Sequence, residues 1–148
     1  MSDEQALLKI LTRVRGDIAR AGLSVIYIGD GADSYLYTAG RTNRHLPELL
    51  IICPLVPQTA YGLMNAIDTA MPERLISGSM LDIGGEFPLK VLDAEDPRAL
   101  EEYARIARQL YGNKVTVQQL VLPDLQGRYP PDCAPPYSRQ PLLGPTVH

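Results

Sequence analysis

Two polar loops carry most of the side chains in this sequence that could bind a ligand or do chemistry. The first loop, residues 40–48 (G-R-T-N-R-H-L-P-E), holds Arg41, Arg44 and His45 and ends at Glu48. Guanidinium groups bind phosphate and carboxylate through paired hydrogen bonds, so this loop could receive an anion. A polar loop between two strands can also carry charges that are merely solvated. Both interpretations stay open at this stage.

The second loop, residues 123–132 (P-D-L-Q-G-R-Y-P-P-D), follows a segment that alternates like a strand, residues 114–122. Its polar side chains are Asp124, Arg128, Tyr129 and Asp132. The spacing from Asp124 to Gly127 is typical of an Asx-type turn ending in a left-handed glycine, where the carboxylate binds backbone amides. In a functional site the same carboxylates would accept ligand hydroxyls or act as a general base. We give the two interpretations equal weight.

Metal and nucleophilic chemistry find little support. His45 and His148 are the only histidines, and no pair of histidines or cysteines has the spacing of zinc ligands. Neither Cys53 nor Cys133 has a histidine nearby in sequence, and no G-x-S-x-G elbow occurs. We therefore expect no metal, no cofactor and no catalytic residue of these classes.

Composition limits the kinds of partner. The chain has 148 residues and a net charge of −3, which argues against a nucleic-acid surface because phosphate binding depends on clustered Lys and Arg. No apolar run approaches the roughly 20 residues of a membrane span, and the N-terminus M-S-D-E-Q is not that of a secretory signal. Two cysteines are too few for a disulfide framework. We expect a cytoplasmic protein with two free thiols.

The elements that would position the loops follow from hydrophobic periodicity. Expected helices cover residues 3–20, with Ser2 and Gln5 as a capping box, 59–70, with Thr59 as the cap, and 96–111, beginning at Asp96. Expected strands cover residues 24–28 and 34–39, joined by a turn at 29–33, and then 48–53, short segments within 74–92, and 114–122.

These elements predict one α+β domain spanning residues 1–148. We expect a mostly antiparallel sheet with about three helices, and an irregular proline-rich tail, residues 123–148, packed on the domain. A barrel-like sheet, similar in outline to flavin-binding split barrels, is the alternative. Fold analogy of this kind carries no function.

Four stretches of the chain resemble a known family. They are Y-T-A-G at 37–40, H-L-P-E-L-L-I at 45–51, Q-Q-L-V-L-P-D-L-Q-G-R-Y-P-P-D at 118–132 and R-Q-P-L-L-G at 139–144. With the helix that begins T-A-Y-G-L-M-N, they resemble domain-of-unknown-function family 4262, of bacteria and phages, from about Gly22 to Gly144. The resemblance implies an α/β fold and a shared feature formed by residues 37–48 and 123–141. It implies no established activity.

Two departures from the family pattern concern residues that a site would use. Leu46 stands where the family has a histidine before Pro-Glu, and His45 is displaced by one residue. Leu122 and Pro131 stand where the family has tryptophans. A mechanism that depends on a histidine in that position would not carry over to this chain.

The leading hypothesis is a small-ligand-binding protein with its site between the two loops. An anionic, nucleotide-like ligand would suit the arginines, and sequestration of a nucleotide signal in phage–host conflict is one version. The expected ligand-binding residues are Tyr37, Thr38, Arg41, His45, Glu48, Asp124, Arg128, Tyr129, Asp132 and Gln140. One alternative is a small hydrolase with Asp124 or Glu48 as general base. Another is an interaction module whose tail docks on a partner or a second copy, making a homo-oligomer.

Overall fold

One six-stranded sheet organises the chain. The structure, a computed structural model, describes residues 2–29 and 33–145. Within these ranges the strands are β1 (Ser24–Ile28), β2 (Tyr35–Ala39), β3 (Glu48–Ile51), β4 (Met80–Leu81), β5 (Leu89–Asp93) and β6 (Val117–Val121). The α-helices are α1 (Asp3–Ala21), α2 (Pro57–Ala70) and α3 (Arg105–Tyr111). Shorter helical turns are η2 (Arg41–Arg44), η3 (Ala99–Tyr103), η4 (Gly112–Lys114) and η5 (Tyr137–Arg139). The expected α+β class is confirmed.

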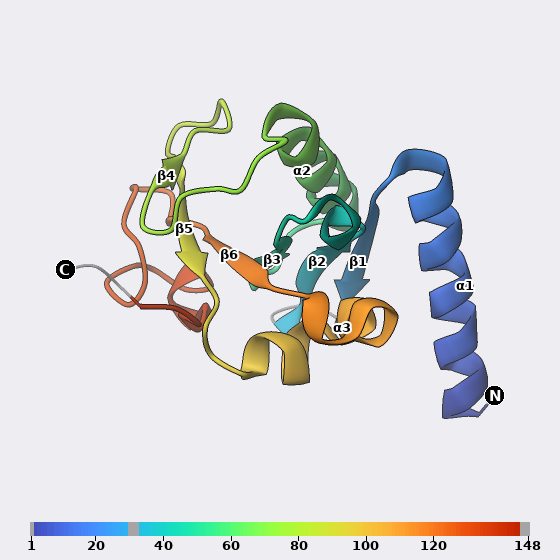
Figure 1. The fold of residues 1–148 in the computed structure, drawn as a ribbon. Helices are drawn as coiled ribbons and strands as arrows, with labels where there is room; N and C mark the ends of the chain where they lie inside the picture. The colour runs from blue at the N-terminus through green and yellow to red at the C-terminus, as the bar shows by residue number, and fades with distance from the viewer. Residues whose placement is uncertain (1, 30–32, 146–148) are drawn as a thin grey trace.

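The sheet is mixed and open. Its order is β1-β2-β3-β6-β5-β4, and every neighbouring pair is antiparallel except β3 and β6, which run parallel (Figure 1). The mostly antiparallel sheet is therefore confirmed. β1 and β4 are the two edges and do not pair with each other, so the barrel-like alternative is not formed.

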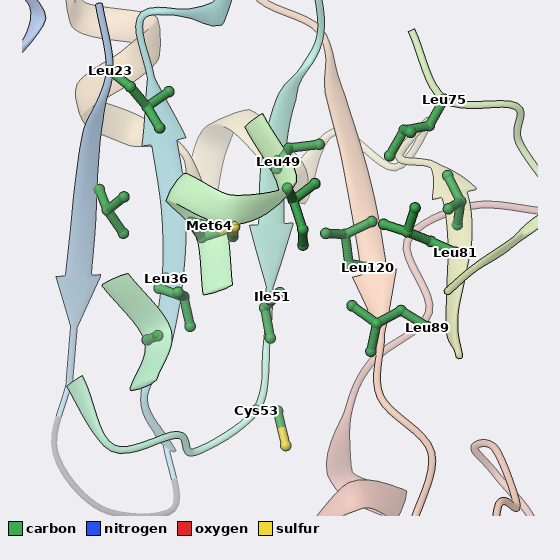
Figure 2. Packing of buried hydrophobic residues seen from close by; sticks show 14 residues of the cluster. Leu23, Leu36, Leu49, Ile51, Cys53, Met64, Leu75, Leu81, Leu89 and Leu120 are labelled. Atoms are coloured by element: carbon green, nitrogen blue, oxygen red, sulfur yellow. The ribbon is translucent and has the colours of Figure 1, made fainter. Parts of the chain in front are cut away.

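Both faces of the sheet are covered. On one face α2 contributes Met64 and Ile67 to an apolar cluster that includes Leu120 of β6 (Figure 2). On the other face α1 and α3 supply the cover, with Val14 among the buried residues. Because both faces are buried, all five residues of β6 are buried, and its sequence does not alternate between core and solvent.

Cys53 lies two residues beyond β3 in the α2-side cluster and is a core residue (Figure 2). Burial raises the pKa of its thiol to about 11, so the reactive thiolate is disfavoured at neutral pH. Cys133 is half-buried, and both thiols are free. This agrees with the free thiols expected from the sequence.

Local capping signals were predicted with mixed success. The Ser2–Gln5 capping box of α1 is present, and Gly22 ends the helix with φ of 79°. Thr59 does not cap α2, because the helix begins two residues earlier at Pro57, with Val56 as the N-cap. Proline is favoured at the first helical position since its missing N–H would have no partner there.

The helix expected over residues 96–111 is interrupted. A π-helical turn, η3, ends at Tyr103, and Ala104 with ψ of 48° separates it from α3. The break leaves the backbone N–H of Ile106 without a helical partner, and that N–H donates to the Tyr37 hydroxyl at 3.0 Å. A contact from a distant strand therefore supports the break. The turn predicted at 29–33 lies mostly outside the described residues.

Buried glutamines attach the chain's C-terminal segment to the sheet. Gln119 of β6 donates to the Pro141 carbonyl at 2.6 Å and accepts from the Leu143 N–H at 2.9 Å. Leu143 is buried among the residues of the α1 and α3 face. This part of the proline-rich tail thus lies against the domain, with the Pro141 carbonyl and the Leu143 N–H paired to the Gln119 side chain.

Candidate functional site

The two predicted loops leave the sheet at opposite ends. β3 and β6 run parallel, with Glu48 opposite Val117 at their starts. The 40–48 loop comes just before β3, whereas the 123–132 loop follows the end of β6. Five strand residues at about 3.3 Å each place the loops roughly 16 Å apart along the sheet. A single small-molecule site made from both loops is therefore not formed, and each loop has to be considered separately.

Glu48 organises the first loop from inside. Its side chain is fully buried and accepts five hydrogen bonds. The donors are the Thr38 hydroxyl at 2.9 Å, the Gly40, Arg41 and Thr42 N–H groups at 3.3, 3.2 and 2.8 Å, and the Thr42 hydroxyl at 2.6 Å. Burial raises the pKa of Glu48, while these hydrogen bonds act in the opposite direction. The carboxylate is committed to the chain's own donors.

Gly40 makes this loop geometry possible. Its φ is 124°, and a Cβ at this position would clash with the Gly22 carbonyl oxygen. Only glycine fits such a backbone beside a neighbouring strand connection. The close approach turns three successive N–H groups towards Glu48. The carboxylate thereby accepts hydrogen bonds from N–H groups at the start of η2, which have no partner within the helical turn.

The two arginines of the first loop bind one aspartate of α2. Arg41 is fully buried, and its Nη1 lies 2.7 Å from Asp68 Oδ1, while its Nε donates to the Pro47 carbonyl at 2.8 Å. Arg44 is partly exposed and contacts both Asp68 oxygens at 2.8 and 3.1 Å. The Nη2 of Arg41 is buried without a hydrogen-bond partner among the described residues. Both arginines that were predicted to bind an anion therefore form ion pairs with Asp68.

Tyr37 and Thr38 lie inside the fold. Tyr37 is buried, receives the Ile106 N–H on its hydroxyl and stacks on Tyr35 with ring centroids 6.4 Å apart. Burial raises the pKa of Tyr37, so the phenol stays neutral. Thr38 is buried and accepts the Leu49 N–H at 2.9 Å while donating to Glu48. Neither side chain is open to a ligand in this structure.

His45 is the last of three consecutive exposed residues of the first loop, after Asn43 and Arg44. It is exposed, and its φ of 60° is the only left-handed value of a non-glycine residue in the described ranges. Sparsely populated backbone conformations of this kind concentrate at functional sites. The residue caps η2 through its own N–H, and it precedes β3 instead of lying in it.

A hollow of about 640 Å³ lies beside His45. The described residues that line it are Thr42, Asn43, His45, Leu46, Tyr111, Lys114 and Thr116. Lys114 is exposed, and the Asn43 amide donates to the Tyr111 hydroxyl at 2.9 Å. Burial and the nearby Glu48 charge raise the pKa of Tyr111, so its hydroxyl keeps a proton to donate. None of the described lining residues is acidic.

Asp124 plays in the second loop the part that Glu48 plays in the first. Its buried carboxylate accepts the Gln126, Arg128 and Ala134 N–H groups at 2.9, 2.9 and 3.0 Å, and Arg128 Nε at 3.1 Å. These hydrogen bonds, the Arg128 N–H first, lower the pKa of Asp124 to about 2. The Asx-type turn is confirmed, with Gly127 at φ of 80° against the Phe87 ring.

The other predicted residues of the second loop are less confined. Arg128 has a half-exposed side chain whose terminal nitrogens have no hydrogen bond among the described residues, and Asp132 is exposed. Tyr129 is half-buried, and its hydroxyl donates to the Pro88 carbonyl at 2.6 Å. Gln140 is buried and pairs with both backbone groups of Leu122 at 2.9 and 2.7 Å. Gln140 thus continues the hydrogen bonding of β6 and does not face a ligand.

Sequence reasoning missed Lys114, Tyr111 and Asn43. Lys114 stood at the start of a predicted strand and Tyr111 at the end of a predicted helix, so both were assigned to elements. Asn43 lies within the first loop, but only the charged arginines beside it were selected as anion-binding candidates. Their meeting depends on the pairing of β3 with β6, for which the sequence carries no local signal.

Residues 2–29 and 33–145 contain no cluster of side chains that could form a metal site. No group of three histidine, cysteine, aspartate or glutamate side chains is placed to hold a metal ion there. In the same ranges, none of the helices combines the length and the apolar character that crossing a membrane requires.

Comparison with known proteins identifies the family and nothing finer. No curated protein and no solved structure matches the chain. The model of the domain of unknown function DUF4262 matches residues 17–134, which include both loops and the whole sheet. The match confirms the resemblance inferred from the sequence motifs, and the chain belongs to the DUF4262 family.

Proposed function

We propose that this protein binds a small anionic ligand, nucleotide-like in character, in the hollow beside His45. The observation that carries the proposal is the convergence of hydrogen-bond donors there without any acidic neighbour among the described lining residues. The Lys114 ammonium and the Tyr111 hydroxyl suit a phosphate or carboxylate, because hydrogen bonds between charged partners are the strong ones. The volume of about 640 Å³ falls in the ordinary range for ligand sites.

The nucleotide-like part of the proposal rests on the apolar surface of the same hollow. The Tyr111 ring and the Leu46 side chain line it next to the cationic and hydroxyl groups. Aromatic rings bind nucleobases by stacking. A ligand with a planar ring at one end and an anion at the other would match both surfaces.

The geometry favours binding over turnover. Both carboxylates expected as general bases, Glu48 and Asp124, are buried and accept four or five hydrogen bonds from the chain itself. A general base must reach the proton that it removes. Neither carboxylate lines the hollow beside His45.

Ligand-induced thermal stabilisation tests the proposal. AMP, adenosine and inorganic phosphate should be compared, and we expect AMP to raise the melting temperature more than either fragment. Lys114→Ala should abolish this shift, because it removes the cation from the hollow. Lys9→Ala, an exposed lysine on α1, is the matched control and should keep it. Equal shifts in Lys114→Ala and the parent protein would contradict the proposal, as would no shift with AMP.

Recovery of the nucleotide separates binding from hydrolysis. The protein is incubated with AMP, denatured, and the supernatant is analysed by chromatography. We expect intact AMP. Adenosine and phosphate in the supernatant would favour the hydrolase alternative.

Self-association is a second candidate, favoured by apolar side chains exposed around the edge strand β4. Ile76, Met80 and Ile83 are 76%, 48% and 38% exposed. Edge strands with exposed apolar residues are typical sites of pairing with another chain. Light scattering over a range of concentrations tests this. We expect a dimer mass that Ile76→Glu reduces to that of a monomer and that Leu125→Glu, at another exposed site, leaves unchanged.

A further inference from the structure

A second hollow lies at the opposite end of the sheet from the proposed ligand site. Its volume is about 480 Å³, and it is lined by the start of β2, the end of β3, the η3 turn and the proline-rich tail. Four segments far apart in sequence thus meet around one space. None of its lining residues belongs to the hollow beside His45, so the two can be tested independently.

One wall of this hollow is aromatic and apolar. Tyr35 and Tyr103 make an edge-to-face pair with ring centroids 4.9 Å apart and planes at 87°. Ile52 and the rings of Pro54 and Pro136 continue the wall. Two perpendicular rings beside aliphatic surface form a corner that suits a large apolar or aromatic side chain.

Charges of both signs border the same space. Asp33, just before β2, is one exposed acidic lining residue; the other two exposed charges are Glu102 from η3 and Arg139 from the tail. Among the described residues neither Glu102 nor Arg139 makes an ion pair, although the chain pairs six other arginines with carboxylates. An unpaired cation and an unpaired anion around an apolar corner would match a ligand that carries both charges.

Arg139 stands on a segment that is fixed at both sides. Gln140 Nε2 donates to the Tyr137 carbonyl at 2.8 Å, and Gln119 Nε2 donates to the Pro141 carbonyl at 2.6 Å. The Tyr35 hydroxyl lies 3.4 Å from the Glu102 carbonyl oxygen, which ties the opposite border to the aromatic wall. Such support reduces the ordering cost of binding.

We propose that this hollow binds a free α-amino acid with an aromatic or large aliphatic side chain. The side chain lies against Tyr35 and Tyr103, the α-carboxylate binds Arg139, and the α-ammonium binds Glu102. A guanidinium holds a carboxylate through two parallel hydrogen bonds, which fixes the orientation of the ligand.

Calorimetric titration with L-phenylalanine and three analogues tests each part. Phenethylamine lacks the carboxylate, 3-phenylpropionate lacks the ammonium, and L-alanine lacks the ring. We expect saturable binding of L-phenylalanine and at least about tenfold weaker binding of each analogue, since each loses one charge-assisted contact or the apolar contact. The absence of saturable L-phenylalanine binding, or equal binding of an analogue, would overturn the proposal.

Variants assign the contacts. Arg139→Ala should remove the preference for L-phenylalanine over phenethylamine, and Glu102→Gln should remove the preference over 3-phenylpropionate. Arg108→Ala, an exposed arginine on α3, and Lys114→Ala should leave both preferences intact. Circular dichroism confirms that each variant is folded, as its exposed side chain leads us to expect. Preferences that survive Arg139→Ala and Glu102→Gln in folded protein would place the ligand elsewhere.

Discussion

The 40–48 loop and the 123–132 loop are each built around one buried carboxylate, yet the two carboxylates differ in their surroundings. The donors to Glu48 are five neutral N–H and O–H groups, and its side chain is fully buried. The donors to Asp124 include the guanidinium of Arg128, which is half-exposed. Burial therefore raises the pKa of Glu48, whereas hydrogen bonding lowers that of Asp124.

The difference is between a loop whose carboxylate and one arginine are buried in the core and a loop whose arginine lies beside water. The first loop is also tied to α2 by a fully buried arginine, Arg41, whereas Arg128 is held only by its own loop. Ion pairs that are removed from water depend strongly on each partner, and exposed ones depend little. Substitutions in the first loop should therefore reduce the free energy of unfolding more than equivalent ones in the second.

The largest loss is expected for Asp68→Ala. This change leaves the Arg41 guanidinium buried without its carboxylate, and Nη2 of Arg41 already has no partner among the described residues. Breaking a buried pair in this way costs about 3–5 kcal/mol. Urea denaturation measures it, with Glu101→Ala on an exposed turn as the control. A loss no larger than that of the control would show that the pair is solvated.

Glu48→Gln should follow. The amide keeps the shape of the side chain but turns an NH₂ group towards backbone N–H groups, two of which donate to the same oxygen. Leaving a buried donor unpaired costs about 1–3 kcal/mol. Urea denaturation again measures the loss, and Glu73→Gln, which is exposed, should change stability by less than about 0.5 kcal/mol. Equal urea midpoints for the two variants would show that the hydrogen bonds to Glu48 do not stabilise the first loop.

The two carboxylates should give pH dependences of opposite sign. The pKa of Asp124 is about 2 in the folded state against an ordinary value of 3.8, so its contribution to stability is present above pH 4 and lost as the pH falls towards 2. The pKa of Glu48 is raised above 4.5, so the folded state binds that proton more tightly and the parent protein gains stability as the pH falls.

Urea midpoints between pH 2.5 and 7 test both signs. The advantage of the parent protein over Asp124→Asn should shrink below pH 4, and its advantage over Glu48→Gln should grow as the pH falls. Leu125→Ala, an exposed and non-titrating neighbour in the second loop, serves as the control and should show neither trend. Parallel trends for Asp124→Asn and Glu48→Gln would mean that the two loops are not electrostatically different.

What the sequence predicted well is what depends on neighbours along the chain. The Ser2–Gln5 capping box and the Asx turn at Asp124 are local hydrogen-bond patterns, and both are present. The hairpin of β1 and β2 has the same local character. Such features form from a few consecutive residues and leave spacing signals that can be recognised.

What the sequence could not provide is the placement of one loop relative to the other. Residues 37–48 and 123–141 stood together as one expected site, but the parallel pairing of β3 with β6 separates them. Parallel pairing is a long-range contact, and the sequence of neither strand predicts whether its partner will run parallel or antiparallel. For the same reason the interaction of Asn43 with Tyr111, 68 residues apart, could not be predicted.

The smallest effect is expected for Arg128→Ala, which addresses the second loop alone. The guanidinium is half-exposed and contacts its partner through Nε only, while three backbone N–H groups keep the turn in place. Exposed pairs of this kind contribute about 0–1 kcal/mol, so the urea midpoint should barely move. AMP-induced stabilisation should also persist, because Arg128 lies at the opposite end of the sheet from the hollow beside His45. Loss of the AMP effect in Arg128→Ala, with Lys114→Ala unaffected, would move the ligand to the second loop and reverse the functional assignment of the two.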